Sequence, residues 1–243
     1  MTDGKKYIPL FMDMESRFHI PAQFLYALAG RESRWNAHDV AGIHGAPTAD
    51  DIKHHAVGLF QITKGVVKDY NTTHDTSYTK SGMLDPRVNA TIAAWYLSEK
   101  VIPKFQVEWN NAKQIAIIAQ AWNSGPYATK RIVDALGNQT VTVDAVKKLA
   151  EHIVKSGKEF DGRPAVDYKW LAGRNTNWAK GVARDTIRAF SNVNFTVPVQ
   201  AGQNQLVKPR SRRSTLAKVN PVRLLSWLIL DLLPVFLRWL LRR

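Results

Sequence analysis

Cysteine is absent from the chain of 243 residues. Its absence excludes disulfide bonds and thiolate metal sites, although it does not indicate a cellular compartment. Alternation of apolar and polar residues with a period of two, which is typical of half-buried strands, is almost absent as well. The length accommodates one well-packed core with appendages, or at most two small domains. We therefore expect an all-α protein whose helices are joined by turns.

The N-terminus lacks the apolar stretch of a secretory signal peptide. Its apolar run, Ile8 to Met12, is too short for the hydrophobic region of such a signal. If the protein works outside the cytoplasmic membrane, we expect another route to have carried it there.

Acidic residues are few compared with basic ones, 20 against 34, which gives a net charge of +14. Nine Lys or Arg and one Asp lie between Val207 and Arg243, a net +8 that leaves +6 for the first 206 residues. A basic surface suits an anionic partner such as nucleic acid, acidic phospholipid or a bacterial envelope. Composition alone does not choose among these partners.

Apolar residues at helical spacing predict helices in the first 190 residues. The predicted apolar faces are Phe24, Leu25, Leu28 and Ala29; Val88, Ile92, Trp95 and Tyr96; Ile115, Ile118, Ala119 and Trp122; Val146, Leu149, Ala150 and Ile153; and Trp178, Val182, Ile187 and Phe190. Pro21 stands at an expected first helical position, and Asp85-Pro86 is a good helix start. The polar stretches 36–57 and 71–82 interrupt the pattern and are interpreted as loops.

Three short motifs follow one another along the chain. They are Glu32-Ser33-Arg34-Trp35-Asn36 at the end of an apolar helix, Gly58-Leu59-Phe60-Gln61-Ile62, and Ala121-Trp122-Asn123-Ser124-Gly125. A Glu that is half enclosed by apolar neighbours has its ionised form disfavoured, so it can stay protonated as a general acid. Taken alone, however, a Glu near a helix end is more often merely solvated, and Asn-Ser-Gly is a good turn by itself.

In their order and spacing, the three motifs resemble those of the soluble-type lytic transglycosylases. Members of that family have a lysozyme-like, goose-type helical fold and cut the glycan strand of bacterial peptidoglycan. Phe60 stands where the family has Met, and Ser124 where it has Ala. Asp85-Pro86, Asn89 and Tyr96 match the helix that lies between the second and third motifs. The resemblance covers residues 20–126.

The resemblance implies that Glu32 acts first as the acid and then as the base, with no cofactor. The substrate-binding residues expected with it are Ser33, Phe60, Gln61, Asn123, Trp178 and Tyr168. Gln61 and Asn123 would hold N-acetyl and hydroxyl groups of the sugars. Trp178 lines up best with a family Tyr that helps to hold the catalytic Glu, and Tyr168 is the alternative.

The implied reaction cleaves the β-1,4 bond between N-acetylmuramic acid and N-acetylglucosamine and leaves a 1,6-anhydromuramic end. A goose-type lysozyme of the same fold would hydrolyse the bond, and hydrolysis usually needs a second carboxylate. Asp39, Asp50 and Asp51 follow Glu32 and leave that alternative open. A membrane-disrupting protein with a wall-targeting domain and an inactive glycan-binding module are further alternatives.

Four histidines crowd the loop after Glu32 without a recognised zinc-ligand spacing, so we expect no metal site there. They are His38, His44, His54 and His55.

The C-terminus differs from the rest of the chain, and we expect a catalytic domain over residues 1–192, a flexible basic linker over 193–220 and an amphipathic helix over 221–243. Of the 18 residues Leu224 to Leu241, 14 are apolar. On a helix, the polar ones fall within an arc of about 160°. A membrane span would bury Asp231 and Arg238 at a cost of about 2.5–3.5 kcal/mol each.

We therefore expect this helix to lie in the interface of an anionic membrane, with a span or docking on a protein partner as alternatives. Nucleic acid is not expected as a partner. A murein-cutting domain without a signal peptide but with a terminal amphipathic helix suggests a bacteriophage protein in the virion or the host cell envelope. It would act in entry or in lysis. A cell-encoded enzyme exported by a specialised secretion machine is the alternative.

Overall fold

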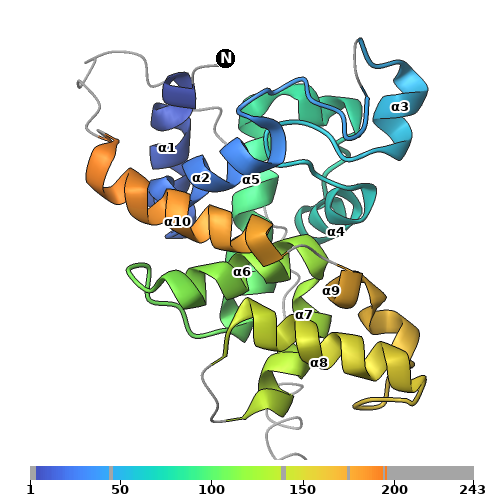
Figure 1. Cartoon of the computed structure of the whole chain (residues 1–243). Helices are drawn as coiled ribbons and strands as arrows, with labels where there is room; N and C mark the ends of the chain where they lie inside the picture. The colour runs from blue at the N-terminus through green and yellow to red at the C-terminus, as the bar shows by residue number, and fades with distance from the viewer. Residues whose placement is uncertain (1–3, 44–45, 138–140, 174–175, 194, 196–243) are drawn as a thin grey trace, which may run out of the picture. The chain divides into compact units, whose positions relative to one another are not determined.

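The described part of the computed structural model is built from helices joined by loops (Figure 1). It comprises residues 4–43, 46–137, 141–173, 176–193 and 195, which lie in one unit, Met1–Val197. Among these residues there is no strand, and backbone pairing outside helices takes the form of isolated antiparallel bridges, such as Val57 with Ile62. The expectation of an all-α fold is confirmed.

The helical elements follow in chain order, with α for α-helices and η for shorter 3-10 or π turns. They are η1 (Gly4–Tyr7), α1 (Ile8–Phe18), α2 (Ala22–Ser33), α3 (Ala49–His54), α4 (Lys64–His74), η2 (Ser81–Leu84), α5 (Pro86–Tyr96), η3 (Leu97–Val101), η4 (Ile102–Lys104), α6 (Ala112–Ser124), α7 (Pro126–Leu136), α8 (Val143–Ser156), η5 (Ala165–Tyr168), α9 (Lys169–Gly173) and α10 (Thr176–Asn192).

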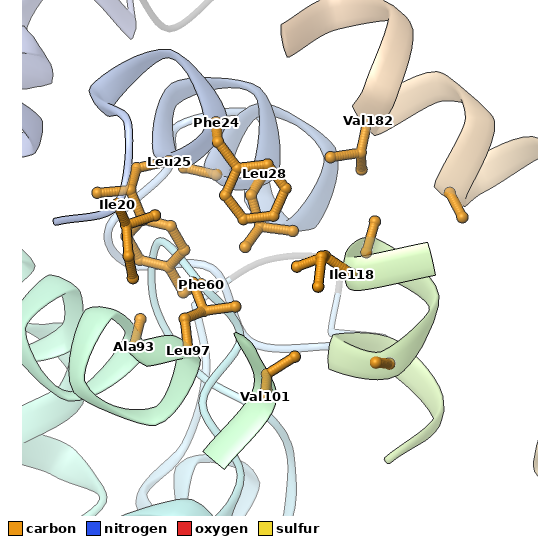
Figure 2. Close-up of a cluster of buried hydrophobic side chains, with 14 of the residues drawn as sticks. Ile20, Phe24, Leu25, Leu28, Phe60, Ala93, Leu97, Val101, Ile118 and Val182 are labelled. Carbon is orange, nitrogen blue, oxygen red and sulfur yellow. The ribbon is translucent and has the colours of Figure 1, made fainter. Parts of the chain in front are cut away.

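Helix α2 lies at the centre of the packing that positions the site. It packs against α1 on one side and against the long helix α10 on another, and α10 also packs along α6 (Figure 1). Side chains from α2, α5, α6 and α10 meet in one buried cluster, in which Leu28, Ile118 and Val182 are labelled (Figure 2). Because Leu28 is fully buried there, the end of α2 is held rigidly.

The helices expected from apolar periodicity are all present. Asp85 caps α5, since its side chain accepts hydrogen bonds from the backbone N–H groups of Arg87 at 2.7 Å and Val88 at 3.2 Å. One boundary differs from the expectation: Pro21 is the N-cap of α2, and the helix begins one residue later, at Ala22. Such shifts are common because the cap residue has non-helical dihedral angles.

Five further α-helices lie where the sequence had indicated no helix: α1, α3, α4, α7 and the short α9. Helix α1 buries Ile8, Phe11 and Met14 at a spacing of three residues, a weaker signal than a continuous apolar run. Helices α3 and α4 occupy stretches interpreted wholly or partly as loop, because α3 buries no residue and α4 buries Val67 alone. Helix α7 follows the third motif directly and begins with Pro126 at its first position.

The expected linker and C-terminal amphipathic helix lie outside the described residues, apart from Val193 and Phe195. The domain boundaries given above therefore stay predictions. In the part of the chain that the structure describes, no helix is both long and apolar enough to cross a membrane.

Candidate active site

The indole ring of Trp35 holds the turn that follows Glu32. Helix α2 ends at Ser33, and both Arg34 and Trp35 have positive φ, at 55° and 58°. Trp35 folds back along the helix, where its Nε1–H donates to the carbonyl oxygen of Tyr26 at 2.9 Å. A Cβ atom at Gly30 would lie 2.6 Å from the Trp35 ring, so glycine is required for this approach. Trp35 thereby holds the last turn of α2, which carries Glu32.

Ser33 joins the end of α2 to the second motif. Its side chain is 5% exposed, and its hydroxyl lies 2.9 Å from the carbonyl oxygen of Leu59 and 3.2 Å from that of Ala29. A hydroxyl has one proton to donate, so these two carbonyls share it. The structure thus gives Ser33 a bracing contact between the first two motifs.

Asn89 holds the turn of the second motif with three hydrogen bonds. Its Nδ2 donates to the carbonyl oxygens of Val57 and Met83, each at 2.9 Å, and its Oδ1 accepts from the backbone N–H of Phe60 at 2.9 Å. Gly58, at φ 82°, passes so close that a Cβ there would lie 2.3 Å from Asn89 Nδ2. Both polar atoms of a fully buried side chain are therefore used, in three hydrogen bonds, to hold this turn.

Phe60 requires a correction. We expected it among the substrate-binding residues, but its side chain is fully buried and meets Phe11 edge to face, with ring centroids 5.8 Å apart. It lies in the core cluster with Leu28 and Leu97 (Figure 2). The next residue, Gln61, lines the cleft instead. Phe60 anchors the turn from within.

Gln61 faces outward from the same turn. With φ at 49°, it lies in the left-handed region, and its Nε2 donates to the carbonyl oxygens of Gly58 at 2.9 Å and Asp39 at 3.2 Å. Lys80 braces the turn further, because its Nζ lies 2.6 Å from the carbonyl oxygens of both His55 and Ile62. The position of Gln61 thus depends on backbone contacts from two loops.

A cleft of about 510 Å³ brings three of the expected site residues together. Its lining residues are Glu32, Asp39, Ala41, Gly42, Ala56, Gln61, Ile62, Thr63, Val66, Tyr96, Trp122 and Asn123. Each of the three motifs thus contributes a polar side chain to one cleft: Glu32, Gln61 and Asn123. Glu32 itself is partly exposed.

Trp122 holds the carboxyl group of Glu32. Its indole Nε1–H donates to Glu32 Oε1 at 2.7 Å, across 90 residues of sequence. Sequence reasoning had treated Trp122 as part of the apolar face of its helix. The available signal was its place inside the third motif, directly before Asn123.

Trp178 and Tyr168, the two candidates for holding Glu32, lie elsewhere. Tyr168 is almost fully buried, and its hydroxyl donates to the carbonyl oxygen of Phe160 at 3.2 Å. Trp178 packs against the hydrophobic core from α10. Neither is among the described residues that line the cleft. The hydrogen bond to Glu32 that we expected from one of these two residues is made by Trp122. The indole of Trp122 can donate a hydrogen bond but cannot accept one.

Asn123 presents a buried acceptor. Within the described part of the chain, its Oδ1 has no hydrogen-bond partner although it is shielded from solvent. A buried polar atom without a partner is costly, so a ligand that supplies an N–H or O–H donor there would recover that cost. Such a site suits a polar ligand rich in amide and hydroxyl groups.

Tyr96 is a cleft residue that the sequence placed in an apolar helix face and in the family-like helix between the second and third motifs, but not among the substrate-binding residues. Its ring packs edge to face on Trp122, with centroids 5.9 Å apart. Burial raises the pKa of its phenol, and the neighbouring Asp69 carboxylate and Tyr127 phenol raise it further. Tyr96 therefore stays protonated near neutral pH and offers a donor to the cleft.

Of the three aspartates that could supply a second carboxylate, one lines the cleft. That residue is Asp39. Asp51 instead accepts from the backbone and hydroxyl of Thr48 in the capping box of α3, which lowers its pKa. Asp50 pairs with His54 at 3.3 Å. Among the described residues, no group of three or more His, Asp or Glu side chains could hold a metal ion.

Comparison with known proteins supports a family assignment. The family model described as "Transglycosylase SLT domain" matches residues 9–140, and no curated protein matches the chain. Among solved structures, the 70 kDa soluble lytic transglycosylase Slt70 from Escherichia coli is similar, at 22% identity and a TM-score of 0.49. The similarity covers 76% of this chain but 24% of that protein, so the chain spans about a quarter of its length. The match over residues 9–140, which includes all three motifs, shows that the chain belongs to the transglycosylase SLT domain family.

Proposed function

We propose that the protein is a peptidoglycan lytic transglycosylase that cleaves the β-1,4 bond between N-acetylmuramic acid and N-acetylglucosamine. Protonated Glu32 donates its proton to the glycosidic oxygen, and the bond from C1 of the muramic acid to that oxygen breaks. The C6 hydroxyl of the same sugar attacks C1, and the Glu32 carboxylate takes up the hydroxyl proton. The products are a free N-acetylglucosamine hydroxyl and a 1,6-anhydromuramic end, and no water is consumed.

The observation that carries this proposal is the contact between Trp122 and Glu32 at the cleft. An indole N–H can only donate, so it satisfies Oε1 whether the carboxyl group is protonated or ionised. The acid can thus give up and regain a proton without reorienting. This suits a residue that acts first as acid and then as base.

Gln61 and Asn123 support the choice of an amino-sugar substrate. Both line the cleft with Glu32, and the buried Oδ1 of Asn123 matches an N–H donor of the kind that an N-acetyl group carries. Gln61 is held by its own amide nitrogen, so that its side chain enters the cleft in a fixed orientation. Family membership supports the same substrate class.

Hydrolysis is the second candidate, and Asp39 is the observation that favours it. Asp39 lines the same cleft as Glu32, and a hydrolase could use a second carboxylate to activate water. Substitution of Asp39 by Asn distinguishes the two reactions. A hydrolase would lose most of its activity, whereas a transglycosylase would keep its product type.

We further propose that the protein works at the bacterial envelope as a bacteriophage virion or lysis enzyme, with its C-terminus on an anionic membrane surface. The support is a murein-cleaving domain in one chain with a segment, Leu224 to Leu241, in which 14 of 18 residues are apolar and basic residues flank both ends. Detection of the protein in purified virions tests the virion role, and its absence there would leave the lysis role.

The experiment for the enzymatic proposal compares the protein with Glu32→Gln on purified murein. The amide keeps the shape and can still accept the hydrogen bond from Trp122, but its N–H protons are not acidic enough to protonate the glycosidic oxygen. We expect a folded variant with almost no cleavage. A variant that keeps most of its activity would show that Glu32 is not the acid.

A further inference from the structure

An aromatic side chain projects from the protein directly beyond the third motif. Tyr127 is the second residue of α7, four positions after Asn123, and it is 64% exposed. An exposed tyrosine ring forgoes the stabilisation that its burial would give. Its place shortly after the cleft residue Asn123 makes it available to a ligand that extends beyond the cleft.

Tyr127 is placed near the cleft by the chain itself. Asn123 lines the cleft at the end of α6, and α7 begins at Pro126 after Gly125 alone. The phenol of Tyr127 also raises the pKa of the cleft residue Tyr96. Tyr96 in turn packs on Trp122, and Trp122 binds Glu32. The exposed ring of Tyr127 therefore follows, within four residues of chain, the end of the helix that carries Trp122 and Asn123.

Lys104 packs on one face of the Tyr127 ring. Its Nζ lies 4.1 Å from the ring centroid, a cation–π contact. Lys104 ends η4, which follows η3 and α5, so it belongs to the same stretch of chain as Tyr96. The ammonium group occupies one face of the ring, and a ligand can use the other face.

We propose that Tyr127 and Lys104 form an outer glycan-binding subsite, in which the open face of the Tyr127 ring stacks on a sugar of the murein strand beyond those at Asn123. Pyranose rings present C–H groups that pack well on the electron-rich face of an aromatic ring. The inference rests on the proposed function. It adds that the enzyme prefers long glycan strands, because this subsite engages a sugar remote from the cleaved bond.

Binding is measured with the Glu32→Gln protein, so that the glycan is not consumed. Murein glycan chains of graded length are titrated into this protein with and without Tyr127→Ala. Loss of one stacking contact should weaken the binding of long chains about two- to tenfold and leave the shortest chains unaffected. Tyr127→Trp, which keeps an aromatic face, should restore the affinity.

Trp170→Ala is the matched control, since Trp170 is similarly exposed, at 67%, but lies on α9. It should leave the affinity for chains of every length unchanged. Equal affinities for Tyr127→Ala and its parent at every chain length would overturn the subsite.

Turnover by the active protein separates this inference from the proposed function. Tyr127→Ala should raise KM for long strands and leave kcat nearly constant. If the unsubstituted protein releases no murein fragments at all, the proposed function fails. If it does release them, and Tyr127→Ala matches it at all chain lengths, only the subsite fails.

Discussion

The hydrogen bond from the Trp122 indole to Glu32 helps to hold the acid in the cleft. Trp122→Phe keeps an aromatic ring next to Tyr96 but removes the N–H donor. Hydrogen bonds to charged groups contribute about 1.5–3 kcal/mol, so we expect kcat to fall about 10- to 100-fold. Steady-state cleavage of purified murein, together with unfolding in guanidinium chloride, measures the effect and checks that the variant is folded.

Trp178→Phe is the control for this substitution. Trp178 packs on the core from α10, outside the described lining of the cleft, so its kcat should stay within about twofold. A large loss of kcat in Trp178→Phe, with little loss in Trp122→Phe, would show that Trp178 holds Glu32, as the family resemblance suggested.

Some site residues could be predicted from the sequence, and others could not. Glu32, Gln61 and Asn123 could be named because each sits at a fixed place in a motif, and the cleft contains all three. Phe60 could not be assigned correctly, since a motif position does not tell which way a side chain points. Trp122 was missed because a helical apolar pattern predicts burial but not which polar atom an indole N–H will meet.

At the scale of elements, the second motif is held in place by Lys80, which contacts carbonyl groups at both ends of the 55–62 loop. Burial lowers the pKa of Lys80 from 10.5 to about 8. Between these two pH values the unfolded chain keeps the proton that the folded protein has released. Unfolding then takes up a proton, and the free energy of unfolding rises with pH.

We therefore expect the unfolding free energy of the unsubstituted protein to increase between pH 8 and pH 10 relative to that of Lys80→Met. Below pH 8 Lys80 is protonated in both the folded and the unfolded protein. The difference in unfolding free energy between the unsubstituted protein and Lys80→Met should therefore be constant there. Guanidinium denaturation at a series of pH values gives this difference directly. A difference that stays flat from pH 7 to pH 10 would show that Lys80 is not desolvated in the folded protein.

The elements that could be predicted were those with a wide apolar stripe or a strong cap. Helix α5 follows from Asp85-Pro86 and its periodic apolar residues, and α6 buries seven successive residues from Ile115 to Ala121. Helices α3 and α4 bury little, so their sequences look like loops. Their helical state depends on local contacts, such as the capping box of Thr48 and Asp51, and on tertiary packing.

At the scale of the whole molecule, we expect the C-terminal segment to attach the protein to anionic membranes. Deletion of residues 222–243 should abolish binding to anionic vesicles, because it removes most of the apolar residues of the tail and four of its basic ones. The domain should still cleave purified murein, since the described core lies before residue 196. Vesicle cosedimentation and murein digestion measure the two properties in the same preparation.

Salt dependence refines this prediction. Attachment in the membrane interface should weaken at high ionic strength, because the basic residues act through a screened surface potential. Release by detergent alone, and not by salt or carbonate, would indicate a span or deep anchor. Aggregation of the truncated protein would indicate that the tail packs on the domain.

The measurement that tests the central claim most directly is mass spectrometry of the muropeptides released from purified murein. A transglycosylase that uses the C6 hydroxyl as its nucleophile forms 1,6-anhydromuramic ends, which are lighter by one water than reducing ends. We predict that anhydro ends dominate, and that Asp39→Asn leaves this product unchanged. A digest dominated by reducing muramic ends would contradict the account and identify a hydrolase in which Asp39 supplies the second carboxylate.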